Sequence, residues 1–312
     1  YDQAIEQFEQ AVDKKKNVPV LHRLYGALIV GIGIVAASVS FTVYGTIHAR
    51  QMTTRSYDIN VEKQVDGIDS LNVVLVADLH LGYSIGCDDM RKMAERINAL
   101  NPDVVIYAGD IFDNDYDALD DEAELKEILH SINAKYGSYA VFGNHDVTER
   151  LLGGFSVASQ AKEMRDPRFE EFAKKAKIRF LDDEVMLIDD AFYLVGRKDA
   201  QKPGDGTKNR MEPEVILSGL DKDKPIIVLE HQPKQLKELE TAGADMQLCG
   251  HTHDGQMFPG NLTVKLMWEN ACGYLKKGNL HSIVTSGVGV WGPAMRVGTD
   301  CEICPITIHF QG

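Results

Sequence analysis

The N-terminal part of the chain shows a change from a polar to a fully apolar pattern. Residues 1–17 are polar and charged, with apolar residues at helical spacing, which predicts a short amphipathic helix. Leu24 to Ile47 contains no charged residue. A helix of this length would extend roughly 36 Å at about 1.5 Å per residue, more than the roughly 30 Å of a hydrocarbon core. We therefore predict a polar segment at 1–23 and a transmembrane helix at 24–47.

Two alternatives to a membrane span remain open. One is a buried core helix, which is usually shorter and carries a polar edge, and the other is a signal peptide, whose apolar stretch normally covers about 7–15 residues. Basic residues flank the stretch at Lys14, Lys15, Lys16 and Arg23 before it and at Arg50 and Arg55 after it. Because Lys and Arg favour the cytoplasmic side, we predict a single span in the cell membrane with the bulk of the chain extracytoplasmic.

The pattern changes again near residue 68, after a segment at 48–67 that reads as a linker. Apolar runs of strand length lie at 71–77, 103–109, 138–143, 225–230 and 245–250. Periodic segments that predict helices lie between them at 90–100, 122–134, 166–177 and 234–241. Later strands are expected at 281–285 and 303–310. Strands that are apolar throughout, with helical crossovers, indicate an α/β domain at 68–312 whose sheets are covered on both faces.

Charge and cysteine content narrow the classes of partner. The chain has 47 acidic and 33 basic residues, a net charge of −14, so we expect no nucleic-acid partner. A phosphorylated substrate stays possible because bound divalent metals supply local positive charge. Cys301 and Cys304 have the spacing of a redox or zinc half-site, and a thiol oxidoreductase is one alternative. Strand alternation would point the two thiols to opposite faces, which favours a structural role.

Each of the five apolar runs stops at residues able to bind a metal. The segments are Asp78-Leu79-His80, Gly109-Asp110-Ile111-Phe112-Asp113, Gly143-Asn144-His145-Asp146, Glu230-His231-Gln232-Pro233 and Gly250-His251-Thr252-His253. Ligands of open α/β sheets bind outside the carboxyl ends of the strands, so we expect these residues on one rim. The glycines before Asp110, Asn144 and His251 should let the backbone turn sharply.

The chemistry of these side chains favours a dinuclear centre. Carboxylates, imidazoles and one amide, without a thiolate, suit two divalent ions of Mn, Fe or Zn better than a structural zinc site. One carboxylate can bridge two cations about 3.5–4 Å apart, and water held between them becomes a hydroxide nucleophile near neutral pH.

In order and spacing, these blocks resemble the calcineurin-like metallophosphoesterase superfamily, whose pattern is D-x-H, G-D-x-x-D, G-N-H-[DE], a lone His and G-H-x-H. The resemblance covers about residues 71–253 and implies a four-layer αββα sandwich of two mixed sheets flanked by helices. It implies that one metal is held by Asp78, His80 and His253. The other would be held by Asn144, His231 and His251, and Asp110 would bridge the two.

The same resemblance implies the catalytic roles. His145 would lie beside the substrate phosphate, with Asp146 orienting its ring and Asp113 supporting the site without binding metal. The implied reaction is attack of a metal-bridging hydroxide on a phosphodiester, pyrophosphate or phosphomonoester. The non-enzyme alternative is a membrane-anchored scaffold or receptor that keeps the fold without catalysis.

The C-terminal part adds a narrower likeness. The segments 250–261 and 286–299, with 44–50 upstream, are similar to bacterial membrane-anchored phosphoesterases. Phe258, Met267, Trp268 and Trp291 surround or follow the last metal block. Core packing is the simpler interpretation of these residues. The alternative is an apolar rim that receives a lipid-linked substrate in place of a phosphorylated small molecule.

Overall fold

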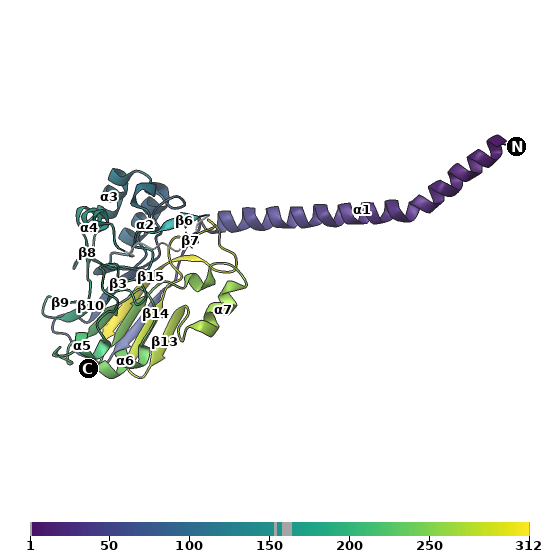
Figure 1. Cartoon of the computed structure of the whole chain (residues 1–312). Helices are drawn as coiled ribbons and strands as arrows, with labels where there is room; N and C mark the ends of the chain where they lie inside the picture. Colours follow the sequence, from purple (N-terminus) through teal and green to yellow (C-terminus); the bar gives the residue numbers. More distant parts are fainter. Residues whose placement is uncertain (1, 153–154, 158–163, 312) are drawn as a thin grey trace. The chain divides into compact units, whose positions relative to one another are not determined.

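The computed structural model describes residues 2–152, 155–157 and 164–311 and divides into the units Tyr1–Thr46 and Ile47–Gly312 (Figure 1). The first unit belongs to helix α1, which is continuous over Asp2–His48, so the expected amphipathic segment and the apolar stretch form one helix. Within it, Arg23–His48 has a mean hydropathy of 2.2 and is long and apolar enough to cross a membrane. The span predicted at 24–47 lies inside this range.

Two mixed sheets form the body of the second unit. The first has the order β1 (Met52–Thr54), β15 (Cys301–Phe310), β3 (Ser70–Val76), β4 (Val104–Ala108), β5 (Ser138–Val141) and β8 (Ile178–Phe180), with β2 (Tyr57–Val61) also paired to β15. Strands β3, β4, β5 and β8 run parallel, and β15 runs antiparallel to β3. The strands predicted at 71–77, 103–109 and 138–143 are therefore confirmed, and the structure shows that they are neighbours.

The second sheet has the order β13 (Gly273–Lys277), β14 (Leu280–Val284), β12 (Met246–Cys249), β11 (Ile226–Leu229), β10 (Phe192–Gly196) and β9 (Glu184–Ile188). Its four central strands are parallel, and β13 and β9 are antiparallel edge strands. A separate hairpin consists of β6 (Arg150–Leu152) and β7 (Phe155–Val157).

The segment 48–67 is not the linker that the sequence predicted. Met52–Thr54 pairs with the start of β15, and Tyr57–Val61 pairs with its end, both in parallel. Ile59 and Val61 are buried while the residues beside them are exposed. This alternation covers too few residues to be recognised as a strand without its partner.

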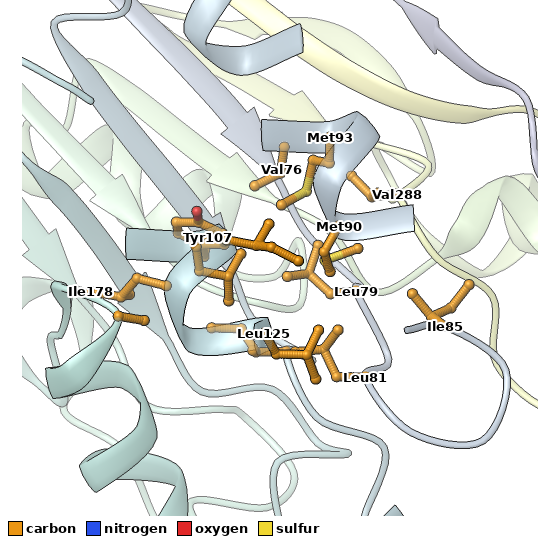
Figure 2. Close-up of a cluster of buried hydrophobic side chains, with 14 of the residues drawn as sticks. Val76, Leu79, Leu81, Ile85, Met90, Met93, Tyr107, Leu125, Ile178 and Val288 are labelled. Atoms are coloured by element: carbon orange, nitrogen blue, oxygen red, sulfur yellow. The ribbon is translucent and has the colours of Figure 1, made fainter. Parts of the chain in front are cut away.

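Three clusters of buried hydrophobic residues lie between the layers of helices and sheets. One cluster joins the outer face of the first sheet to α2 (Cys87–Ala99), α3 (Glu122–His130) and α4 (Pro167–Lys175). Figure 2 shows part of it, with Val76 and Tyr107 of the sheet near Met90 and Met93 of α2. A second cluster fills the space between the sheets, and a third joins the second sheet to α5 (Pro213–Ile216) and α6 (Leu236–Ala242). The predicted four-layer αββα sandwich is confirmed.

The two cysteines of the CxxC spacing lie on opposite sides of β15. Cys301 belongs to the cluster that joins the first sheet to α2, α3 and α4, whereas Cys304 belongs to the cluster between the two sheets. Both thiols are buried, and burial raises the pKa of each. Buried, protonated thiols on opposite faces cannot form one redox pair, so the structural interpretation of these cysteines holds.

Candidate metal centre

The loops after β3 and β4 are held together beyond the ends of the strands. The backbone N–H of Asp78 donates to Gly109 O at 2.9 Å, and that of His80 donates to Asp110 O at 3.1 Å. Leu79, between the two candidate ligands, is fully buried in the cluster under α2. Leu79 thus anchors the loop on the helix side of the first sheet, while Asp78 and His80 belong to the ligand group described next.

Asp78, His80 and His253 form the first group of candidate ligands. One ligand atom from each lies within 4.8 Å of the others, and all three residues are buried. His80 Nε2 is 3.1 Å from His253 Nε2, and His253 Nε2 is 3.5 Å from Asp78 Oδ1. Two imidazole nitrogens and a carboxylate oxygen that face one another in this way suit a divalent cation.

Asp110, His231 and His251 form the second group, also within 4.8 Å. His231 Nε2 is 3.0 Å from Asp110 Oδ2 and 3.2 Å from His251 Nδ1. The other ring nitrogen of His231, Nδ1, donates to Ala108 O at 2.8 Å. Because a carbonyl only accepts, Nδ1 carries a proton, and Nε2 is the ring atom that faces Asp110 and His251 and that a metal would bind.

Asp110 lies between the two groups. Its Oδ2 is 3.0 Å from His231 Nε2 and 3.8 Å from His80 Nε2, which is where a bridging carboxylate would stand. Asn144 follows β5, and its Oδ1 is buried with no hydrogen-bond partner among the residues that the structure describes. Since buried polar atoms are normally satisfied, this oxygen fits a metal ligand. The residues present therefore fit two divalent cations.

His145 belongs to a third group, with His80 and Asp113. Asp113 Oδ1 is 3.4 Å from His80 Nδ1 and 3.5 Å from His145 Nδ1. A carboxylate on the ring nitrogen that faces away from the metal fixes the orientation of a ligand histidine. This is the position expected for Asp113 as a supporting residue.

The structure corrects the expected partner of the His145 ring. The carboxylate of Asp146 accepts the backbone N–H of Phe112 at 2.8 Å and of Gly143 at 2.7 Å, so it shapes the loop that carries His145. The ring atom Nδ1 of His145 lies 2.6 Å from Asn114 Oδ1. Asn114 was missed because an amide in an acidic loop carries no signal by itself.

Several candidate ligands have left-handed backbone conformations. The φ values are 54° for Asp78, 47° for His80, 51° for Asp110, 76° for His251 and 51° for His253. Such a conformation costs a non-glycine residue roughly 1–2 kcal/mol and is concentrated at functional sites. The fold thus maintains strained loops at the rim where the ligands meet.

The glycines before the ligands serve two different purposes. Gly109 has a φ of 86°, so the predicted sharp turn before Asp110 is confirmed. Gly143 has no such conformation, but a Cβ at this position would lie 2.1 Å from Asp110 Oδ1. The chain does turn here, since the backbone N–H of Asp146 donates to Gly143 O at 3.3 Å. Gly143 is therefore needed for the close approach of the Asn144 loop to the bridging carboxylate and not for a left-handed conformation.

Burial shifts the ionisation of this cluster. Burial, together with the neighbouring Asp110 carboxylate, raises the pKa of Asp78 to about 6 and that of Asp146 to about 7. Burial opposes ionisation of Asp110 as well, but the imidazoles of His231 and His145 hold its pKa well below the usual range. Burial would lower the pKa of His231, yet the Asp110 carboxylate raises it to about 10. Divalent cations would compensate the buried negative charge.

Arg296 is a second residue that the sequence did not single out. It is fully buried, and its Nη1 donates to His253 O at 3.1 Å while its Nη2 donates to Ser286 O at 2.6 Å and to Gly289 O at 2.8 Å. The guanidinium therefore ties the loop at 286–289 to the backbone of a candidate ligand. A single Arg in a glycine-rich segment gives no sign of this role.

Aromatic side chains border the open side of the centre. The Trp268 ring lies 5.2 Å from the His251 ring, and the Trp291 ring lies 6.3 Å from the His145 ring. A mainly apolar cavity of about 290 Å³ adjoins the centre and is lined by residues that include His253, Val264 and Trp291. Both tryptophans are partly exposed, so simple core packing does not describe them.

Comparisons with a family model and with related proteins agree on one protein family. A family model described as calcineurin-like phosphoesterase matches residues 71–255. The chain is 32% identical over 282 residues to a Danio rerio protein named transmembrane protein with metallophosphoesterase domain, covering 85% of this chain and 60% of that one. It is 27% identical to an uncharacterized metallophosphoesterase of Aquifex aeolicus, covering 86% of this chain and 96% of that one.

A solved structure of a dimetal phosphatase from Danio rerio has a TM-score of 0.41 and 13% identity, covering 70% of this chain and 87% of that chain. The chain spans about 60% of the length of the first curated relatives that it matches.

Proposed function

Since the chain belongs to the calcineurin-like phosphoesterase family, we propose that it is a dinuclear metal-dependent hydrolase of phosphoric esters. The observation that carries the proposal is the pair of ligand groups, Asp78–His80–His253 and Asp110–His231–His251, with Asp110 between them. Asn144 would complete the second group. When bound, two divalent cations would supply a hydroxide nucleophile near neutral pH and neutralise charge on the phosphoryl oxygens.

The proposed role of His145 follows from its place on the open side of the centre. Its backbone N–H donates to Asp110 Oδ1 at 2.7 Å, so the loop position is tied to the bridging carboxylate. If Nδ1 donates to Asn114 Oδ1, only ring atom Nε2 is left to face a substrate. Nε2 would then protonate the leaving oxygen or stabilise charge on it. Asp146 would act through the loop backbone.

For the substrate we propose a lipid-linked phosphodiester or pyrophosphate, ahead of a phosphorylated small molecule. The apolar cavity beside His253 and Trp291 supports this, because it offers space for an apolar group next to the reacting phosphorus. The apolar helix at Arg23–His48 would keep the enzyme at a bilayer. The Lys and Arg distribution favours the cell membrane with the catalytic unit extracytoplasmic.

The function is tested with variants of the bridging and substrate-facing residues. We expect Asp110→Ala to abolish both metal loading and hydrolysis, because it removes the shared ligand. We expect His145→Ala to lower turnover by roughly 10²–10⁴-fold while the metal content stays unchanged. Elemental analysis gives the metals, including whether they are Mn, Fe or Zn. Rates with bis-p-nitrophenyl phosphate and p-nitrophenyl phosphate give the activity.

Two outcomes would change the proposal. A His145→Ala protein that loses its metals would contradict the division of roles. A metal-loaded wild-type protein that hydrolyses neither ester nor lipid phosphates in detergent would favour the scaffold alternative.

Labelling of single cysteines introduced on either side of the span tests the proposed orientation.

A further inference from the structure

An apolar surface beside the metal centre is left uncovered by the chain that the structure describes. Helix α7 (Gly260–Met267) contains no buried residue. Phe258, Leu262, Leu266 and Met267 expose 59%, 54%, 89% and 74% of their surface, and we call these four residues the α7 patch. Because short helices gain most of their stability by packing an apolar face, such a surface is expected to have a partner.

The α7 patch is linked through hydrogen bonds to His48, which belongs to the second unit. His48, the last residue of α1, has its Nε2 3.1 Å from Thr299 O. Thr299 Oγ1 in turn donates to Gln256 O at 2.7 Å, and the backbone N–H of Phe258 donates to Val297 O at 2.8 Å. Two hydrogen bonds, followed by the two chain steps from Gln256 to Phe258, therefore connect His48 to the first residue of the patch.

We propose that the α7 patch inserts into the membrane interface and forms a second attachment of the catalytic unit beside the span. The end of a membrane helix stands at the bilayer surface, so residues bonded to His48 are held there. The patch alternates with the polar residues Asn261 and Lys265, and Trp268 follows it, a composition typical of interfacial helices. The proposal rests on the membrane anchoring proposed above and is independent of the hydrolase activity.

Insertion would also determine what reaches the metal centre. Trp268 follows α7 directly, and its ring is 5.2 Å from that of the candidate ligand His251. Val264 of the same helix lines the apolar cavity beside His253. A phosphate at the headgroup level of the leaflet would then lie at the open side of the centre, without first leaving the bilayer.

The two tryptophans of the chain, Trp268 and Trp291, provide the measurement because both lie at this surface. The full chain is reconstituted into nanodiscs whose lipids carry bromine atoms at defined depths, which quench nearby indoles. We expect quenching of the wild type, strongest with bromine close to the headgroups. The double variant Leu262→Glu/Leu266→Glu should lose roughly half or more of the quenching, because charged side chains leave the acyl region.

The matched control is Val215→Glu, which places the same charge on an apolar residue of α5 that exposes 60% of its surface. It should keep the wild-type quenching, and all three proteins should hydrolyse a soluble diester at the same rate. Absence of quenching in the wild type, or equal quenching of the double variant, would overturn the proposal. Unquenched tryptophans with cross-links through the patch in discs holding two chains would assign it to a second copy instead.

Discussion

The space around the Cα of Gly143 is too small for a methyl group. The Cβ of Gly143→Ala would lie 2.1 Å from Asp110 Oδ1, so either the Asn144 loop or the carboxylate must move. We expect the catalytic efficiency to fall about 10²-fold, the effect of an ångström-scale misplacement of reacting groups. Steady-state kinetics with a soluble diester, together with elemental analysis, measures this.

Gly82→Ala is the control for this effect. Its Cβ would meet Asp113 Cβ at 3.4 Å, an ordinary van der Waals distance, in a loop of the same site. This variant should keep most of the activity. If both alanine variants behaved alike, the close approach of Gly143 to Asp110 would not matter for the centre.

At the scale of elements, the end of β11 is fixed by a buried ionic network. Glu230 directly precedes the candidate ligand His231, and its carboxylate lies 2.9 Å from Arg197 Nη1 and 2.5 Å from Arg210 Nη1. Arg197 and Glu230 are fully buried. Arg197 follows β10, so the network joins the ends of the neighbouring strands β10 and β11 next to the candidate ligand His231.

We expect Arg197→Met to lower the free energy of unfolding by about 3–5 kcal/mol, because it leaves part of a buried charge uncompensated. Denaturant unfolding measures the change. Arg179→Met is the comparison, because Arg179 pairs with Glu184 at 2.5 Å in an exposed position, where a pair contributes roughly 0–1 kcal/mol. Equal effects of the two substitutions would show that the buried network does not stabilise the strand ends.

The sequence predicted the elements that position the site better than the residues that support it. The long apolar runs matched β3, β4, β5, β11 and β12 to within two residues, because buried parallel strands differ strongly from their surroundings. The edge strands β9 and β13 were missed, since each is half exposed and has a weak pattern. Helix α7 was missed because it has no buried face to produce a periodic pattern.

The candidate ligands were found because each follows a strand, whereas their supports depend on tertiary contacts. Asp113 was recognised because it matches the second acid of the G-D-x-x-D block of the family pattern. Asn114 contacts a ring nitrogen of His145, and Arg296 donates to backbone carbonyls such as His253 O. Neither type of contact can be recognised from the sequence. The role expected for Asp146 was wrong for the same reason, since its carboxylate binds backbone N–H groups of its own and a neighbouring loop.

At the scale of the whole molecule, one buried histidine couples stability to pH. His281 in β14 is buried, and burial together with Lys276 lowers its pKa in the folded state, while Glu62 acts in the opposite direction. Its Nδ1 lies 2.9 Å from Tyr274 Oη. The unfolded chain therefore takes up this proton first, so stability is full above the ordinary histidine pKa of about 6.5 and is lost as the pH falls below it.

We expect His281→Gln to flatten this dependence, because glutamine does not titrate. Urea unfolding at pH 7.5 and at pH 5.5 gives the free energy of unfolding of both proteins. The loss between the two conditions should be smaller in the variant than in the wild type. An identical loss in both proteins would mean that His281 takes up no proton on unfolding in this range.

The pairing of β15 with β1 and β2 determines when the first sheet can be completed during translation. Met52 pairs with Cys301 and Val61 with Phe310, so β1 and β2 are paired with a strand that is translated roughly 250 residues later. At about 5–20 residues per second, β2 waits roughly 10–50 s after its own synthesis. Throughout this interval the edge of β2 that later bonds to β15 is unpaired. The first sheet can therefore be completed only after translation of β15, and until then β1 and β2 are open to pairing with other strands.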